Sequence, residues 1–332
     1  MVTIDIHTHF FAEELMKKLD RSLIDSFGEE ATIRRFYESE DLGLSMERAE
    51  ERIELMDKWG LEKAVLSFPS PRSFIEDKYL KDPEFSVEFS RAVNDYLKKA
   101  RDSYEDRIFA FASIPKLDNK KAIEELERAV KSLSLQGVEI DSNIFGNHLA
   151  SKKYRPFFTR ADELGVPIYI HPTSPLGSTR MDRFYTDSMI GFPFETTLTA
   201  TYMIFSGFLE KYNNLNIILS HVGGALPFLK RRLEFLYHKK DPEFKRNLIS
   251  NLRKEPVEYL EDFWFDTAMS FPRAIQMTLD EIGNRLIFGS DYPFGPKKAV
   301  EDTMKQIREL EISKKEVRKI RELNAKKILL NC

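Results

Sequence analysis

The chain has 332 residues, of which 42% are hydrophobic and 32% charged, and its formal net charge is −3. Acidic and basic residues are interleaved, which excludes the one-signed basic surface of a nucleic-acid-binding protein and indicates a globular protein with a sizeable core. The one cysteine is Cys332, so the sequence excludes a disulfide within the chain and a zinc site built from cysteines.

No basic segment followed by an apolar segment opens the sequence, and no run of about eighteen apolar residues occurs in it. We therefore expect a cytoplasmic protein with neither a membrane nor a nucleic-acid partner. The length exceeds that of a typical single domain but lies within the range of α/β barrels.

Residues 2–6 predict a buried strand that leads into His7-Thr8-His9. Because residues two apart in a strand face the same side, His7 and His9 should point the same way. Two neutral imidazoles placed like this are good ligands for zinc, manganese or iron. The pair alone is also compatible with one histidine packed in the core and another in a loop, so the rest of the chain must decide.

A charged segment, residues 13–51, follows the first strand and reads as an insertion, and from there short apolar runs alternate with helical stretches. This alternation is typical of βα units and a parallel sheet. The further strands are expected at residues 64–68, 108–114, 137–140, 167–170, 216–219, 263–266 and 286–288. The helices are expected at residues 46–59, 86–100, 120–132, 154–164, 195–212, 227–237, 297–310 and 314–329.

Eight strands with intervening helices, in a chain of this length, predict an α/β fold of the (β/α)8 TIM-barrel type. We expect one domain over residues 1–332, with insertions after strands 1 and 5, the second covering residues 173–193. A doubly wound open sheet is the alternative, but no Gly-x-Gly-x-x-Gly follows the first strand.

Ionisable residues gather at the expected carboxyl ends of the strands, where the active sites of such barrels lie. His171 ends the fifth strand, His221 the sixth and Asp291 the eighth, so four of the six histidines fall at strand ends. Three histidines and a carboxylate can bind one divalent cation and leave a position open for a substrate. A fourth histidine can then carry protons near neutral pH.

Five motifs extend this pattern along nearly the whole chain. They are Asp5-Ile6-His7-Thr8-His9, Ile170-His171-Pro172, Gly191-Phe192-Pro193-Phe194-Glu195-Thr196-Thr197, Ser220-His221-Val222-Gly223-Gly224-Ala225-Leu226-Pro227-Phe228 and Gly289-Ser290-Asp291-Tyr292-Pro293-Phe294. With them the sequence resembles the amidohydrolase superfamily, in the branch of aminocarboxymuconate-semialdehyde decarboxylase and γ-resorcylate decarboxylase. Within the third motif, Glu195 fits a carboxylate at a helix start at least as well as a direct role, and a supporting role is a third interpretation.

The resemblance implies a set of site residues. The metal ligands would be His7, His9, His171 and Asp291, with His221 and Asp291 as the catalytic residues. Dinuclear relatives bridge their metals with a lysine at the end of the fourth strand, but residues 138–141 contain none, so one metal is expected. The cofactor would be one divalent metal ion, with zinc preferred and manganese or iron as alternatives.

The resemblance also implies a homodimer and a substrate-binding arginine. That arginine would be Arg232, reaching the neighbouring subunit's site to hold a second carboxylate of a small-molecule carboxylate substrate. Arg231 is the alternative if the register differs by one, and a second substrate arginine would fall near Arg34 or Arg35.

The function implied is that of a metal-dependent carboxy-lyase, a nonoxidative decarboxylase of an unsaturated or aromatic carboxylic acid. A metal-dependent hydrolase of an amide, lactone or ester is the alternative, because the same residues would serve it. A catalytically inactive metal-binding scaffold is a more remote alternative, since every expected ligand and His221 are present.

Overall fold

The computed structural model describes residues 2–27, 48–69, 80–116, 118–175, 177–181, 183–238, 242–243, 252–294 and 298–330. Arg34 and Arg35 lie outside the described residues. None of the described helices is both long enough and apolar enough to cross a lipid bilayer.

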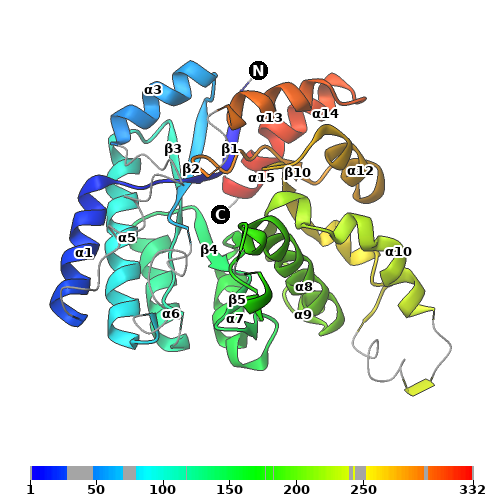
Figure 1. Cartoon of the computed structure of the whole chain (residues 1–332), viewed down its shortest axis with the longest axis horizontal. Helices are drawn as coiled ribbons and strands as arrows, with labels where there is room; N and C mark the ends of the chain where they lie inside the picture. Colours follow the sequence, from blue (N-terminus) through cyan, green and yellow to red (C-terminus); the bar gives the residue numbers. More distant parts are fainter. Residues whose placement is uncertain are drawn as a thin grey trace.

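Eight strands form one parallel sheet in the order of the chain (Figure 1). They are β1 (Ile4–His9), β2 (Lys63–Ser67), β3 (Ile108–Ala112), β4 (Gly137–Asp141), β7 (Ile168–His171), β8 (Ile217–Leu219), β9 (Phe263–Asp266) and β10 (Leu286–Ile287). The last strand returns to the first, since the amide of Ile6 donates to the carbonyl of Phe288 at 2.9 Å. The sheet is therefore a barrel, and the predicted (β/α)8 fold is confirmed.

The helices surround the strands, as Figure 1 shows. They are α1 (Glu13–Phe27), α3 (Ala49–Trp59), α5 (Pro83–Ser103), α6 (Asn119–Glu127), α7 (Arg155–Leu164), α8 (Phe192–Phe205), α9 (Phe208–Lys211), α10 (Leu226–Tyr237), α12 (Pro272–Ile282), α13 (Ala299–Arg308), α14 (Lys314–Arg318) and α15 (Asn324–Leu329). A short antiparallel pair, β5 (Asn143–Ile144) and β6 (Asn147–His148), follows β4.

Several elements differ from the sequence expectation, among them α1 and the β5–β6 pair, which were not expected. The first strand extends through His9, so both histidines lie within it. The single helix expected at 195–212 is divided into α8 and α9 at Gly207, whose φ is 71°. Helix α12 was not expected, although Ile275, Leu279 and Ile282 recur at helical spacing and are all buried.

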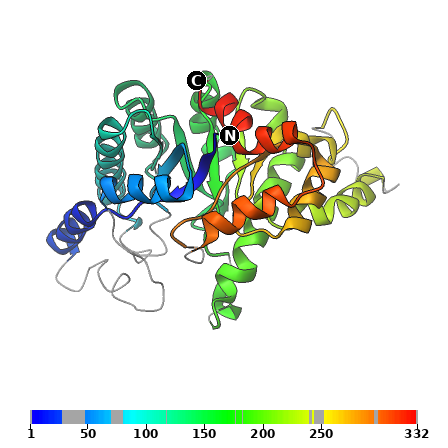
Figure 2. The same ribbon diagram turned by 90° about the horizontal axis from the view of Figure 1, so that it is seen from above.

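Strand side chains alternate between two apolar layers. The barrel interior contains Ile4, Ile6, Val65, Phe111, Tyr169, Ile218, Trp264 and Ile287, and residues of α15 pack against this layer. The other layer lies between the strands and the surrounding helices. Figure 2 shows the N- and C-termini on the same side of the molecule. Since α15 covers the end of the barrel where the strands begin, the open end of the barrel is the opposite, carboxyl end.

Candidate active site

The two histidines of β1 lie on one face of the strand, as its period predicts, beside an irregularity in the strand. The register of β1 against β2 shifts between Asp5 and Thr8, and the buried Asp5 carboxylate accepts from the amides of His7 at 3.2 Å and Ser290 at 3.1 Å. The Nε2 atoms of His7 and His9 lie 3.1 Å apart. Burial raises the pKa of Asp5 to about 7.

The structure brings together the four residues for which the resemblance implied metal ligation. His7, His9, His171 and Asp291 are buried, and each offers one donor atom within 4.8 Å of the others. Asp291 Oδ1 lies 3.1 Å from His7 Nε2 and 3.3 Å from His9 Nε2. The donors come from β1, from the end of β7 and from the segment after β10, so only a closed barrel can assemble them.

The second nitrogen of each histidine has a partner in the protein. His7 Nδ1 lies 2.9 Å from Asp266 Oδ2, His9 Nδ1 lies 3.1 Å from Ser67 Oγ, and His171 Nδ1 lies 3.0 Å from the carbonyl oxygen of Pro172. These partners leave each Nε2 directed at the cluster, and His171 Nε2 is buried without a hydrogen-bond partner. An unpaired buried nitrogen is costly, and Nδ1 contacts of this kind orient metal-binding histidines. The residues therefore fit one divalent cation.

The electrostatics of His9, His171 and Asp291 suit the same role. Burial lowers the pKa of His7, but Asp291 and Asp266 raise it well above its usual value. Burial lowers the pKa of His9 to about 4 and the pKa of His171 well below its usual value, so both are neutral at pH 7. Burial alone raises the pKa of Asp291, but the nearby His7, His221 and His9 hold it well below its usual value. Neutral imidazoles and an ionised carboxylate are the forms that bind metal.

His221 lies beside these four donors. Its Nε2 is 3.2 Å from Asp291 Oδ2, and its side chain is 14% exposed, whereas those of His7 and His9 are fully buried. The backbone of His221 has a positive φ of 55°, and its amide donates to Asp266 Oδ1 at 2.8 Å. His221 therefore contacts the carboxylate of the cluster and is more accessible than His7 and His9.

Asp266 is a site residue that the sequence analysis missed. Besides holding His7 and the amide of His221, it accepts from the hydroxyl of Tyr169 at 2.5 Å and from the amide of Ala268 at 2.9 Å. The signal was available, because Asp266 stands at the carboxyl end of a strand just as His171 does. It was overlooked because a single acid at a strand end does not reveal what it holds.

Arg52 is a second missed residue. It is 1% exposed, donates to the carbonyl oxygen of His9 at 2.7 Å and to Thr8 Oγ1 at 3.2 Å, and lies 4.8 Å from the ring centre of Tyr292. The sequence predicts a helix at Arg52, but it does not reveal which backbone groups the side chain of Arg52 reaches. Arg52 fixes the end of β1 and thereby the position of His9.

The fourth strand ends in carboxylates where dinuclear relatives carry a lysine. Glu139 is buried, its Oε2 has no hydrogen-bond partner, and burial raises its pKa to about 8. Asp141 forms an ion pair with Lys116. Within the described part of the chain, His7, His9, His171 and Asp291 form the only group of this kind that could hold a metal. The expectation of a single metal ion stays a prediction.

The third motif supports the loop that carries His221. Glu195 is buried and accepts from Asn143 Nδ2 at 2.9 Å, while Thr197 Oγ1 accepts from the amide of Ala225 at 2.8 Å. Of the three roles open for Glu195, its buried contact with Asn143 favours the supporting one. The threonine ties α8 to the turn after β8.

Gly224 is required where that turn approaches α8. Its φ is 66°, and a Cβ atom there would lie 1.9 Å from the carbonyl oxygen of Pro193. We expect Gly224→Ala to lower the free energy of unfolding by about 2 to 4 kcal/mol, through backbone strain and displacement of the His221 turn. Urea denaturation measures this effect. Gly165→Ala, with a similar φ of 66° but open space around it, is the control for strain alone, and equal losses in both variants would contradict the close approach.

Arg232 is not brought to the cluster of its own chain. It lies exposed on α10 and has no ion pair with any residue in the described ranges, whereas Arg231 pairs with Glu234 at 2.6 Å. If Arg232 binds substrate, it must do so in another subunit.

Comparison with known proteins places this geometry in a family. The family model described as amidohydrolase matches residues 4–330. The chain is 28% identical over 217 residues to 2-amino-3-carboxymuconate-6-semialdehyde decarboxylase of Dictyostelium discoideum, covering 65% of this chain and 59% of that protein. It is 28% identical over 306 residues to 6-methylsalicylic acid decarboxylase of Penicillium expansum, covering 90% and 87%.

A solved structure agrees. Dihydroxybenzoic acid decarboxylase from Polaromonas sp. JS666, which was crystallised with bound manganese and the inhibitor 2-nitroresorcinol, superposes with a TM-score of 0.78 and 26% identity, covering 100% of this chain and 98% of that one. The resemblance seen in the sequence motifs is thus confirmed, and the chain belongs to the amidohydrolase family, in the branch that contains these decarboxylases.

Proposed function

We propose that the chain is a metal-dependent carboxy-lyase that removes CO2 from an aromatic or unsaturated carboxylic acid without oxidation. The observation that carries this proposal is the buried group of His7, His9, His171 and Asp291 with His221 in contact with its carboxylate. The decarboxylases among the relatives support a carboxy-lyase over a hydrolase.

A divalent cation bound by His7, His9, His171 and Asp291 would stabilise negative charge on the carboxylate and neighbouring oxygen of the substrate. His221 and Asp291, whose side chains are 3.2 Å apart, share the proton that must reach the ring or chain carbon bearing the carboxylate. When that carbon has been protonated, its bond to the carboxylate breaks, the electron pair returns to the carbon and CO2 leaves. One proton is consumed, and His221 is exposed enough to take up the next from water.

The metal is proposed to be a divalent ion, zinc or manganese before iron. Three imidazoles and one carboxylate suit all three, so the donor set does not choose among them. The Polaromonas structure holds manganese, whereas the sequence analysis preferred zinc, and the zinc expectation stays a prediction. Metal analysis of protein purified without added metal, followed by reconstitution with each ion, identifies the one that supports activity.

The function is tested by incubating the reconstituted protein with a panel of hydroxybenzoates and unsaturated dicarboxylic acids. We expect CO2 release from at least one of them, dependent on added metal and lost when a chelator removes it. In parallel, amides, lactones and esters are assayed for hydrolysis. If hydrolysis is observed and no acid releases CO2, the hydrolase replaces the carboxy-lyase as the proposed function. If neither reaction is detected, the inactive scaffold is favoured.

We also propose a homodimer, supported by large exposed apolar side chains on α8, on α10 and in the segment before α8. Phe184, Met189 and Phe194 are 82%, 60% and 55% exposed, and Phe228 and Phe235 on α10 are 75% and 70% exposed. Helices α8 and α10 both contact the turn at His221–Gly223. Exposed apolar clusters of this kind mark protein–protein interfaces.

We expect Phe235→Asp to convert a dimer into a monomer, because a charge buried in an apolar interface costs several kcal/mol, on the order of the whole stability of a weak dimer. Light scattering coupled to size-exclusion chromatography measures the mass. Leu330→Asp places the same charge at another exposed apolar position and should not change the mass. A wild-type monomer would contradict the homodimer.

For Arg232 we propose contact with an anionic group of the substrate bound in the second subunit. Arg232→Ala should raise KM by about tenfold to 100-fold with a smaller change in kcat, as expected when a charge-assisted hydrogen bond made in the ground state is lost. Arg231→Ala is the matched control, because its side chain is 91% exposed and already paired with Glu234. If Arg231→Ala raises KM instead, the register is displaced by one residue.

A further inference from the structure

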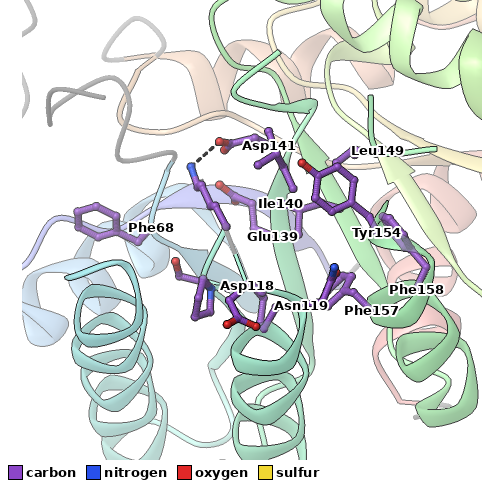
Figure 3. A pocket seen from close by; sticks show the side chains of 16 residues that line it. Phe68, Asp118, Asn119, Glu139, Ile140, Asp141, Leu149, Tyr154, Phe157 and Phe158 are labelled. Carbon is purple, nitrogen blue, oxygen red and sulfur yellow. Dashed lines mark hydrogen bonds and ion pairs between the residues drawn. The ribbon is translucent and has the colours of Figure 1, made fainter. Parts of the chain in front are cut away.

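A narrow side pocket opens beside the metal centre, where two neighbouring strands separate. The ladder between β3 and β4 ends at Ala112 and Val138, and the segments beyond it diverge. The space between them, a cavity of about 50 Å³, extends from the barrel interior to the first turns of α6 and α7. We call it the side pocket, and Figure 3 shows residues that line it.

The inner end of the side pocket adjoins the cluster of metal-binding donors. Asp141 pairs in register with His171, and adjacent strands lie about 4.8 Å apart, so the two side chains are neighbours on the inner face. The Ser67 hydroxyl, which lies 3.1 Å from His9 Nδ1, lowers the pKa of Glu139 and so lies close to it. The inner end of the side pocket is therefore within reach of a molecule that presents its carboxylate to the cluster.

Two buried polar atoms in the side pocket have no hydrogen-bond partner. They are Glu139 Oε2 and the hydroxyl oxygen of Tyr154, on side chains that are 8% and 4% exposed. Glu139 lies at the inner end, while Tyr154 lies in the helix layer among Leu149, Phe157 and other apolar residues (Figure 3). Buried polar atoms are rarely left unpaired, because each costs about 1 to 3 kcal/mol. Both therefore indicate a ligand with hydrogen-bonding groups.

The charges at the inner end restrict what that ligand can be. Lys116 forms an ion pair with Asp141, and their side chains are only 12% and 5% exposed (dashed line in Figure 3). The cation is thus neutralised by an acid of the protein itself, and the other nearby acid is Glu139. A carboxylate entering here would meet the carboxylate of Asp141 and no unpaired cation, while a hydroxyl or methoxy group would meet no such penalty.

We propose that the side pocket receives a ring substituent of the substrate, and that the Lys116–Asp141 pair makes it accept a neutral hydrogen-bonding substituent and reject a second carboxylate. Asp141 is then a specificity-determining residue of this chain, acting through the charge it supplies to Lys116. The inference rests on the proposed decarboxylation of an aromatic acid, and it adds which members of that class are accepted.

The test compares matched 2-hydroxybenzoates that carry either a hydroxyl or a carboxylate at ring position 3, 4 or 5. Binding to the metal-loaded protein is measured by isothermal titration calorimetry, and CO2 release is measured separately. At the position that faces the side pocket, wild-type protein should bind the hydroxyl compound about tenfold or more tightly than its carboxylate counterpart. Asp141→Asn should raise the affinity for the carboxylate compound about tenfold, because the ion pair of Lys116 with Asp141 no longer opposes a pair with the ligand.

Two variants separate charge from loosened packing. The double variant Lys116→Met/Asp141→Asn lacks both charges, so the gain in affinity for the carboxylate compound should disappear. Asp102→Asn removes an acid that pairs with a lysine elsewhere on the surface, Lys98, and should leave every affinity unchanged. If the melting temperature shows that Asp141→Asn does not fold, Lys116→Met replaces it as the test. Lys116→Met should lower the affinity for the carboxylate compound further and change the affinity for the hydroxyl compound by less than about threefold.

The outcomes distinguish this inference from the proposed function. If the affinities change with the charge at residue 141 as predicted but no compound releases CO2, the proposed role of the side pocket is supported and decarboxylation is refuted. If both compounds release CO2 and Asp141→Asn leaves the ratio of their affinities unchanged, the proposed role of the side pocket is refuted and decarboxylation is supported. If wild-type protein binds none of the compounds, both proposals fail.

Discussion

Asp266→Asn is expected to lower the affinity for the divalent cation by about 100-fold, at the upper end of what residues behind metal ligands contribute. The asparagine oxygen can still accept from the amides of His221 and Ala268, so the turn after β8 should persist. Its amide nitrogen would then face His7 Nδ1 in place of the carboxylate oxygen that lies 2.9 Å away. His7 Nδ1 would then have to accept a hydrogen bond from that amide, so the ring proton would move to Nε2. The Nε2 lone pair that binds the metal would be lost.

The measurement is a titration of the apoprotein with manganese or zinc against a competing chelator at pH 7. Tyr169→Phe is the matched control, because it removes another partner of Asp266 and leaves His7 in the same tautomer. It should change the metal affinity by less than about tenfold. If both variants weaken binding equally, Asp266 acts through general packing and not through the proton on His7.

His221→Asn is expected to reduce kcat by about 1000-fold, within the range for loss of a general acid–base group, while the metal content stays at the wild-type level. Asparagine is chosen because it tolerates the positive φ of 55° at this position better than alanine does. The amide of residue 221 would still donate to Asp266, so the local backbone should persist. What is lost is the ring nitrogen that lies 3.2 Å from Asp291 Oδ2.

Metal content by elemental analysis and CO2 release by single-turnover kinetics check the two halves of this prediction separately. His238→Asn serves as the control, since His238 is 64% exposed on its side chain and lies on the surface beside Glu255. Loss of metal from His221→Asn would show that His221 is itself a ligand. Unchanged kcat would show that the proton comes from elsewhere, with Asp291 as the next residue to examine.

Sequence patterns were sufficient for the barrel and for the residues of its mouth. The alternation of strands and helices defines a parallel barrel, and a parallel barrel has only one end at which strand-terminal side chains can meet. For this reason His7, His9, His171 and Asp291 could be grouped although they are separated by up to 284 positions. Helix α12 was missed despite its periodicity, because the strands expected on either side of it already brought the number of strands to the eight of a barrel.

The sequence by itself therefore determined the fold, the family motifs and which side chains face a common centre, since strand periodicity and topology are properties of local patterns. Only the tertiary structure decided which partner each of them holds. Asp266 behind His7, Arg52 behind His9, and the Lys116–Asp141 pair at the side pocket all join elements distant in sequence. Such contacts depend on how side chains pack between elements, and no spacing along the chain encodes them.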